Sequence, residues 1–305
     1  MKIHTLDLHF QGHPQAIASY LLEAPDGPVV IESGPMSTLK ALKERLAEHG
    51  LQPADVRHVF VTHIHLDHAG AAGWWANQGA RVYVHPAGAP HLLDPSKLWQ
   101  SAGRIYGDEM EILWGEIIPA PAEQIVVVED NEVVDAAGLQ ITALATPGHA
   151  SHHHTYVVED AAFTGDAAGV RLPGSPWVAL PAPPPEFKME VWEETLKRLG
   201  AQTVDAFYPT HFGRVEDWKH QLDQLWATMG AATAFIRRLM EAGVSREEII
   251  RRYAAWNREQ AEATGMPPHV FDVYEAANPL FMSVDGIVRY WRKKAEREER
   301  EQEQA

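Results

Sequence analysis

Four side chains of types that bind metal ions lie within a run of six residues, at His63, His65, Asp67 and His68. Imidazole and carboxylate groups are common protein ligands of zinc, iron and manganese. Residues two positions apart in an extended segment point the same way, so His63 and His65 could bind one ion. Asp67 and His68 would then face a neighbouring position. A lone histidine here would be ordinary polar surface, but four ligands at this spacing predict a loop that supplies two metal positions.

A strand must position this loop, and similar strands precede three further candidate ligands. The run 57–61 is short, β-branched and aromatic, which is typical of a buried strand. The other candidates also follow strand-like segments: His149 after 139–144, Asp166 after 161–163 and His211 after 204–208. Each strand would therefore end in a ligand.

The order HxHxDH, then His, Asp and His, resembles that of the metallo-β-lactamase superfamily, over roughly residues 1–215. The resemblance implies an α/β fold: an αββα sandwich of two mixed sheets with outer helices and the site at one edge of the sheets. It also implies a glyoxalase II-like set of ligands for two ions. The first ion would be held by His63, His65 and His149, and the second by Asp67, His68 and His211, with Asp166 bridging them. The chain is most similar to prokaryotic hydrolases of this fold without an assigned substrate.

Two departures from the family pattern bear on the chemistry. The strand 28–31 ends in Glu32, where the family usually has an aspartate, and this carboxylate could orient the ligand loop or lie on the surface. The chain has no cysteine. It therefore does not resemble the β-lactamases that use a cysteine ligand at the second ion, and thiolate zinc sites and disulfides are excluded.

The resemblance implies hydrolysis by a hydroxide that bridges two divalent ions. Two ions about 3.5–4 Å apart lower the pKa of a shared water toward neutrality. Asp166 would bridge the ions, and Asp67 would orient the hydroxide, so both are the expected catalytic residues. No G-x-S-x-G pattern supplies a protein nucleophile. We favour zinc because the histidine-rich first site resembles hydrolytic zinc sites, with iron and manganese as alternatives.

Composition and charge restrict the class of substrate and the location that we expect for the protein. The chain has 305 residues, 45% of them hydrophobic, and lacks an apolar stretch long enough to cross a membrane. Its N-terminus alternates like a strand, so we expect a cytoplasmic protein with no membrane contact. Two divalent cations would reduce the formal charge of −16 only to −12. Such a surface disfavours nucleic acid and favours a small-molecule ester, thioester or lactone.

The pattern of expected strands and helices along the chain predicts one catalytic domain and a helical extension. We expect a catalytic domain over residues 1–213, a helical extension over 214–292 and a solvated or frayed charged tail over 293–305. The extension could line the pocket, support a homodimer or only complete the core. Its second helix should begin at Ser245, which opens a capping box, and two short helices should follow Pro268 and Pro279. The expected elements before it are strands near 3–10, 16–22, 28–32 and 81–84, helices near 38–49, 69–78 and 95–114, and four strands between 124 and 164.

Several residues near the predicted ligands could contact the substrate or support a ligand. Arg171 could pair with a substrate carboxylate or phosphate, and Tyr208 could hydrogen-bond the substrate, although a solvated arginine and a packed tyrosine are the alternatives. One residue of the run 152–154 could support a ligand, while three histidines in a row are also typical of a strand start. We expect His85 and His91 to be structural.

Three other functions use the same ligand types. A phosphodiesterase or nuclease would need the same two ions and a basic face. An iron-dependent oxidoreductase such as a sulfur dioxygenase would need iron at one site, and a non-enzymatic metal-binding module would be expected to lack some ligands. The complete set of seven places hydrolysis first.

Overall fold

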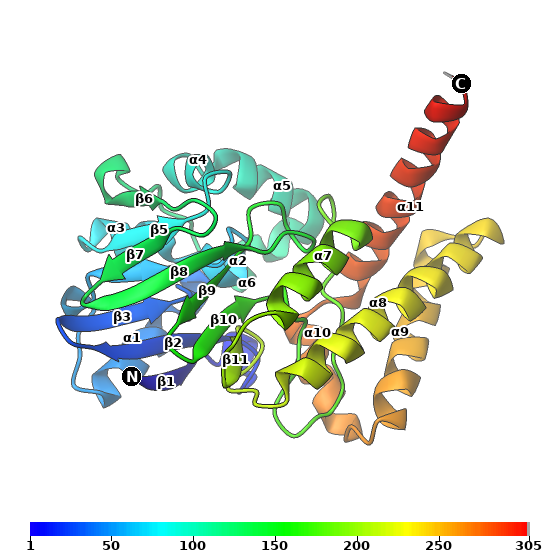
Figure 1. Cartoon of the computed structure of the whole chain (residues 1–305). Coiled ribbons are helices and arrows are strands. Elements are labelled where there is room, and N and C mark those ends of the chain that lie inside the picture. The colour runs from blue at the N-terminus through cyan, green and yellow to red at the C-terminus, as the bar shows by residue number, and fades with distance from the viewer. Residues whose placement is uncertain (304–305) are drawn as a thin grey trace.

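Two β-sheets pack face to face at the centre of the computed structural model, which describes residues 1–303 (Figure 1). The first sheet has the order β1-β2-β3-β4-β5-β6, with β1 to β3 antiparallel and β3 to β6 parallel. Its strands are β1 (Lys2–Asp7), β2 (Ala18–Ala24), β3 (Gly27–Ile31), β4 (His58–Phe60), β5 (Arg81–Val84) and β6 (Ile125–Val127).

The second sheet has the order β11-β10-β9-β8-β7, in which only β10 and β11 run parallel. Its strands are β7 (Val133–Ala136), β8 (Leu139–Ala145), β9 (His154–Val158), β10 (Ala161–Gly165) and β11 (Ala206–Pro209). This arrangement confirms the predicted sandwich of two mixed sheets.

Aromatic side chains fill the space between the sheets. Tyr20 and Leu22 on β2 face the second sheet, whereas Leu21 between them faces the outer helices, as the alternation of a strand requires. Phe60 meets Tyr156 of the opposite sheet edge to face, with ring centroids 5.0 Å apart. This packing fixes the strand ends from which the predicted ligands follow.

Helices cover the outer face of the first sheet. Helices α1 (Leu39–Glu48) and α3 (Ala72–Asn77) pack on it through Leu42, Leu46 and Trp75. The predicted helix over 69–78 is instead α2 (Leu66–Ala69) followed by α3. The predicted helix over 95–114 is divided into α5 (Ser96–Tyr106) and α6 (Met110–Trp114), because Gly107 between them has a φ of 54°. The short helix α4 (Ala89–Leu93) precedes α5.

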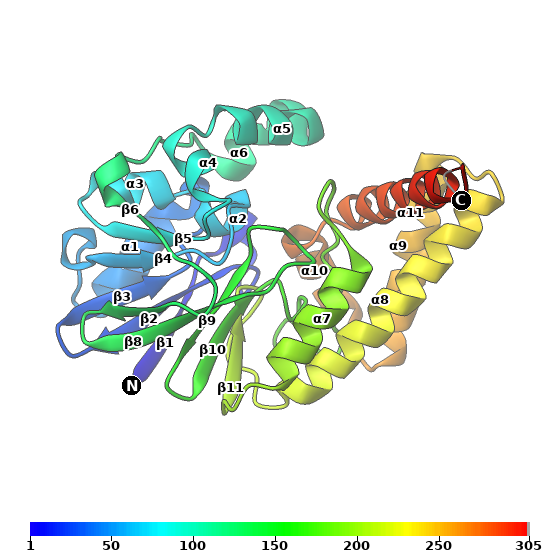
Figure 2. The same cartoon turned by 45° about the horizontal axis from the view of Figure 1, so that its top comes forward.

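The helices after residue 188 gather beside the β11 edge of the second sheet (Figures 1 and 2). They are α7 (Met189–Gly200), α8 (Trp218–Glu241), α9 (Arg246–Ala263), α10 (Phe271–Ala277) and α11 (Leu280–Glu303). One continuous core cluster joins the outer face of the first sheet to α8, α9 and α11. The domain boundary at 213 remains a prediction, but the extension shares its core with the rest of the chain.

The expected start of the second extension helix is confirmed, and residues 293–302 of the expected charged tail are helical and mostly exposed to solvent. The backbone N–H of Glu248 donates to the Ser245 hydroxyl, 3.3 Å away, at the start of α9. The helix after Pro279 is long rather than short, because α11 continues to Glu303. Charged pairs one turn apart, such as Lys293 with Glu296 at 2.6 Å, support its last turns. Residues 304–305 of the predicted tail lie outside the described residues.

The strands and helices between residues 124 and 200 differ from the prediction in two ways. Five strands, β6 to β10, occupy the region where four were expected. Helix α7 was not expected at all. No helix within residues 1–303 is long and apolar enough to cross a membrane.

Candidate metal centre

The structure brings all seven predicted ligands together at one edge of the sandwich. His63 and His65 follow β4, and Asp67 and His68 lie on the short helix α2 directly after them. The remaining three follow strands of the second sheet: His149 after β8, Asp166 after β10 and His211 after β11. Because β10 and β11 run parallel, Asp166 and His211 leave the sheet at the same edge.

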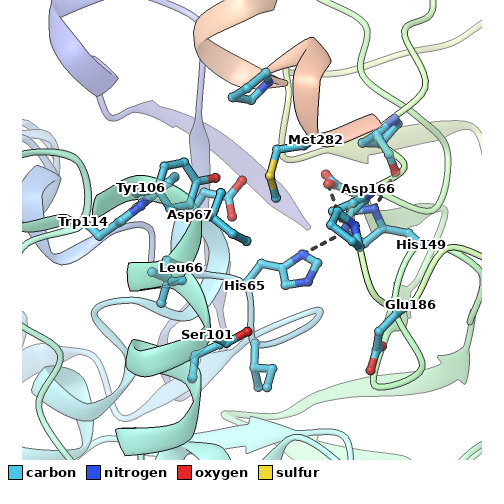
Figure 3. A pocket seen from close by; sticks show the side chains of 18 of the residues that line it. His65, Leu66, Asp67, Ser101, Tyr106, Trp114, His149, Asp166, Glu186 and Met282 are labelled. Carbon is cyan, nitrogen blue, oxygen red and sulfur yellow. Dashed lines mark hydrogen bonds and ion pairs between the residues drawn. The ribbon is translucent and has the colours of Figure 1, made fainter. Parts of the chain in front are cut away.

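Three imidazoles form the first group of ligands. The facing nitrogens are Nε2 of His63, Nδ1 of His65 and Nε2 of His149, and they lie 2.9 to 3.1 Å apart. Figure 3 shows His65 and His149 turned toward each other. Three ring nitrogens that converge in this way offer three lone pairs to one point, which is the arrangement that a zinc-type site requires.

Asp67, His68 and His211 form the second group. Oδ2 of Asp67 lies 3.4 Å from Nε2 of each of the two histidines. Asp166 faces both groups, since its Oδ1 is 3.5 Å from Nε2 of His68 and of His211 and its Oδ2 is 3.4 Å from Nε2 of His149. This is the position that a bridging carboxylate would occupy.

The outer nitrogens of the histidines support metal binding because they fix which nitrogen carries the proton. Nδ1–H of His149 donates to the Pro181 carbonyl at 2.8 Å, and Nδ1–H of His211 donates to the Ala16 carbonyl at 2.7 Å. A histidine that donates from Nδ1 in this way directs its Nε2 lone pair inward. Within residues 1–303, Nε2 of His68, Nε2 of His211 and Oδ1 of Asp166 are buried without a hydrogen-bond partner. A metal ion would satisfy all three atoms, so the residues present fit the predicted group.

Glu32 is buried and makes hydrogen bonds that orient the ligand loop. This is the first of the two roles predicted for it, and the alternative was a surface position. It is 1% exposed, and its Oε1 accepts hydrogen bonds from the hydroxyls of Thr62 and Thr210, at 2.5 and 2.9 Å. The same oxygen accepts from Nδ1–H of His68 at 2.9 Å. The hydroxyl of Thr62 in turn lies 3.1 Å from Nδ1 of His63. One buried carboxylate therefore holds a ligand of each group.

Burial and charge give the two groups different protonation. Burial lowers the pKa of His65 and of His149 to about 3, so both are neutral and can bind a metal ion at pH 7. Burial opposes the charged form of His68, but Asp67 and Glu32 outweigh it and hold the His68 pKa well above its usual value. Burial likewise raises the pKa of Asp67, yet His68 and His211 reverse this and keep the carboxyl ionised. Without metal, a protonated His68 therefore balances the charge of Asp67, and a bound cation would take the place of that proton.

A cavity of about 310 Å³ opens beside the ligands (Figure 3). His65, Asp67, His149 and Asp166 are among the residues that line it. Most of its wall is apolar and comes from α5, α6, the segment 181–186 and the junction of α10 with α11. These apolar residues include Leu66, Leu98, Ile105, Trp114, Pro183 and Met282. The C-terminal extension therefore lines the pocket, which was one of its expected roles.

The two residues predicted to bind substrate are placed elsewhere. Arg171 pairs with both carboxylate oxygens of Asp217, at 2.7 and 3.0 Å. Tyr208 is buried between the sheets, where its ring stacks on Phe163 with centroids 5.1 Å apart. Neither belongs to the described lining of the cavity. The alternatives of a structurally engaged arginine and a packed tyrosine describe them better.

The histidine run after His149 has three separate roles. His152 lines the cavity, and His153 accepts a hydrogen bond from the backbone N–H of Asp166 at 3.2 Å. His154 begins β9 and is fully buried. His91, expected to be structural, also lines the cavity, whereas His85 packs against His154 with ring centroids 4.6 Å apart.

Sequence reasoning missed Glu186 and helix α7. Glu186 lines the cavity and its Oε2 lies 3.7 Å from Nε2 of His152. On α7, Trp192 packs against His149, with ring centroids 5.9 Å apart. Gly148 has a φ of +135°, and a side chain there would overlap Trp192, so Gly148 is needed for this close approach. The apolar spacing of Trp192, Leu196 and Leu199 could have revealed α7.

Comparison with protein families identifies the chain's relatives. A family profile described as the metallo-beta-lactamase superfamily matches residues 14–211. A metallo-beta-lactamase fold-containing protein of Sulfurisphaera tokodaii is 32% identical over 145 residues, which cover 46% of this chain and 54% of that protein. The chain thus spans about half the length of this relative.

The relatives with named activities include a thioesterase and a lactonase. An atrochrysone carboxyl ACP thioesterase of Aspergillus fumigatus is 25% identical over 214 residues, covering 69% of this chain and 55% of that protein. An N-acyl homoserine lactonase of Rhizobium johnstonii is 25% identical over 233 residues, covering 67% of this chain and 80% of that protein.

A solved structure resembles almost the whole chain. A metallo-beta-lactamase family protein from Thermus thermophilus superposes with a TM-score of 0.68 at 22% identity, covering 96% of this chain and 94% of that chain. This likeness shows the fold, and it includes the C-terminal helices.

Proposed function

Because the chain belongs to the metallo-beta-lactamase superfamily, we propose that it is a metal-dependent hydrolase of a small ester, thioester or lactone. The observation that carries the proposal is the convergence of seven side chains that could bind metal, four of which line a largely apolar cavity. Divalent ions held there would activate water at neutral pH and polarise the scissile carbonyl group. We propose zinc for both positions because imidazole and carboxylate donors without thiolate suit it.

Asp67 and Asp166 are the proposed catalytic residues. Asp67 is ionised and lines the cavity, so its free oxygen can accept a hydrogen bond from the attacking water and orient it. Asp166, 4% exposed, faces both ligand groups and sets their spacing. The backbone N–H of Asp166 donates to His153, which restricts its movement.

The cavity wall supports an acyl group as the part of the substrate that enters it. An apolar surface beside a charged centre favours a substrate with an apolar segment next to a reactive carbonyl. The relatives named as a thioesterase and a lactonase act on carbonyl compounds, and this supports the same reaction class here. The apolar wall also gives no support to a highly charged phosphodiester close to the ligands.

A substrate panel tests the proposal. Zinc-loaded protein should hydrolyse octanoyl thioesters, aryl octanoates or γ-lactones, and Asp67→Asn should lower kcat/KM about 100-fold or more because it removes both a ligand and a proton acceptor. Arg171→Gln is the matched control and should retain activity. Turnover of bis(p-nitrophenyl) phosphate but of none of the carbonyl compounds would contradict the proposal.

A further inference from the structure

A second cavity, of about 620 Å³, meets the first at Pro185 and Glu186, which line both. Five cationic side chains line it: Lys188, Arg289, Lys293, Lys294 and Arg297. We call this cavity the basic groove. Its other end reaches Pro147 and Gly148, immediately before the ligand His149. The groove is therefore a neighbour of the metal centre and not a remote surface feature.

The charge of the groove is opposite to that of the chain. The whole chain has a formal charge of −16, whereas the groove has five cations and only two acidic side chains, Glu186 and Glu190. Glu190 is already bound to Lys294 at 2.6 Å, and Glu186 accepts from the backbone of Ser151 at 2.5 Å. Such a local excess of positive charge in an acidic protein attracts an anion.

Lys293 is also paired, with Glu296 at 2.6 Å, so Lys188, Arg289 and Arg297 are the cations that remain to meet such an anion. Arg289, Lys293 and Arg297 are four residues apart, so they lie along one face of α11. Lys188 reaches the same groove from the residue before α7. Within residues 1–303, Lys188, Arg289 and Arg297 form no ion pair with an acidic side chain. Several unpaired cations from two elements match a phosphate-bearing group better than a single carboxylate.

We propose that the substrate is an acyl ester or thioester whose leaving group carries phosphate, with the acyl chain in the apolar cavity and the phosphate in the basic groove. This inference rests on the proposed function and names its substrate class. Hydrolysis breaks the bond between the acyl carbon and the sulfur or oxygen of the leaving group. The water oxygen bonds to the acyl carbon, and a proton ends on the released thiol or alcohol.

Matched substrates with and without phosphate test the inference. Octanoyl-coenzyme A is compared with octanoyl-pantetheine, and an octanoyl lysophosphatidic acid is compared with monooctanoylglycerol. At least one phosphate-bearing substrate should exceed its phosphate-free counterpart in kcat/KM by about tenfold. Which pair shows the difference identifies the leaving group as a thiol or an alcohol. Equal rates within both pairs would overturn the inference.

A charge-neutralised variant locates the effect. Arg289→Gln/Lys293→Gln/Arg297→Gln should lower the ratio within the responding pair toward one. The control Lys40→Gln/Arg238→Gln/Arg292→Gln removes equal charge from outside the groove and should preserve the ratio. If the groove variant fails to fold, the salt dependence of the unmodified protein decides, because only the phosphate-bearing substrate should lose kcat/KM between about 50 and 500 mM NaCl. An unchanged ratio in the variant or equal salt dependence would overturn the inference.

Failure of this inference can be told apart from failure of the proposed function. Equal hydrolysis with and without phosphate would leave the hydrolase standing and remove only the role of the groove. No hydrolysis of any of the four substrates by zinc-loaded protein would overturn the substrate class, and the broader carbonyl panel would then decide the proposed function separately.

Discussion

At the scale of single residues, the candidate centre depends on hydrogen bonds made by the outer nitrogens of its histidines. Glu32, Pro181 and Ala16 provide oxygen acceptors to His68, His149 and His211 respectively. Such contacts orient a ligand before metal arrives, so that binding need not order the side chain.

Replacing Glu32 by Gln tests this orientation. The amide keeps the shape but loses the charge that holds His68 and the hydroxyls of Thr62 and Thr210. We expect metal affinity at the second position to fall about 10- to 100-fold. Competition with a chromophoric chelator measures it. Glu23→Gln, on the exposed end of β2, is the control, and equal affinities in both variants would contradict the role of Glu32.

His154 gives the metal-free protein a defined pH dependence. Burial, with His85 nearby, lowers the pKa of His154 to about 3, so it is neutral in the folded state. The unfolded chain binds a proton there near pH 6.5, and stability is therefore lost as pH falls below that value. Between about pH 7.5 and 5.0 this one residue should reduce the free energy of unfolding by about 2 kcal/mol.

Urea unfolding of chelator-treated protein at the two pH values measures the effect. His154→Phe keeps an aromatic ring beside Tyr156 and should lose less stability on acidification than the unmodified protein. The exposed His220→Gln is the control and should behave like the unmodified protein. A His154→Phe variant with the full pH dependence would show that other groups cause it.

These residues also show what could be predicted from the sequence. The seven side chains that the fold brings together could be predicted because each is chemically distinctive and follows a recognisable strand or lies in the run directly after one. The carbonyls of Ala16 and Pro181 could not be found, since every residue has a carbonyl and only the fold decides which one meets a histidine. The prediction that Arg171 binds substrate failed for a related reason. Its ion-pair partner Asp217 is distant in the sequence, so the pairing could not be seen there.

At the scale of elements, α11 supports the ligand His149 through the proline-rich segment before α7. The hydroxyl of Ser283 on α11 donates to the Leu180 carbonyl at 2.8 Å and accepts from the N–H of Ala182 at 3.2 Å. Between these two residues lies Pro181, whose carbonyl accepts from His149. Helix α11 is thus connected to the ligand His149 through the backbone of residues 180–182.

Ser283→Ala breaks this connection. It leaves the buried N–H of Ala182 without its partner, while the Leu180 carbonyl keeps only the hydrogen bond from Asn278 at 3.2 Å, so the free energy of unfolding should fall by about 1–3 kcal/mol. We also expect weaker metal binding at the position of His149, because Pro181 is less firmly held. Denaturant unfolding and metal competition measure the two effects, with Ser37→Ala as an exposed control. Lost stability with unchanged metal affinity would show that α11 does not support the ligand.

The helices and strands that could be predicted were those with a distinctive apolar pattern or helix cap in the sequence. Alternating or apolar strands and the Ser245 cap were visible in the sequence, whereas α7 was overlooked and the exposed residues after 292 were not expected to be helical. The last turns of α11 have few apolar residues, and the pairing of charges along a helix is less distinctive than an apolar stripe.

At the scale of the whole molecule, the metal ions should contribute to stability. Buried ligands with unsatisfied atoms disfavour the metal-free fold, and an ion that binds only the folded state stabilises it by mass action. Removing metal with a chelator should lower Tm by several degrees. At a free metal concentration about 100 times Kd, each bound ion adds about 3 kcal/mol to the free energy of unfolding. Differential scanning calorimetry checks this, and recovery of Tm on adding zinc but not magnesium is the control.

The sandwich and its site were predictable from the sequence, but the relation of the extension to the cavity was not. Its helices meet the metal centre through α10, α11 and the segment 181–186, and such contacts between distant segments have no local signature. The homodimer and the cytoplasmic location stay predictions.

Elemental analysis of protein purified without added metal tests the central claim most directly. The account predicts about two equivalents of divalent metal per chain, mainly zinc, falling to about one when His211→Ala removes a ligand of the second position. Less than one equivalent of any metal, or a single equivalent of iron unaffected by His211→Ala, would contradict it.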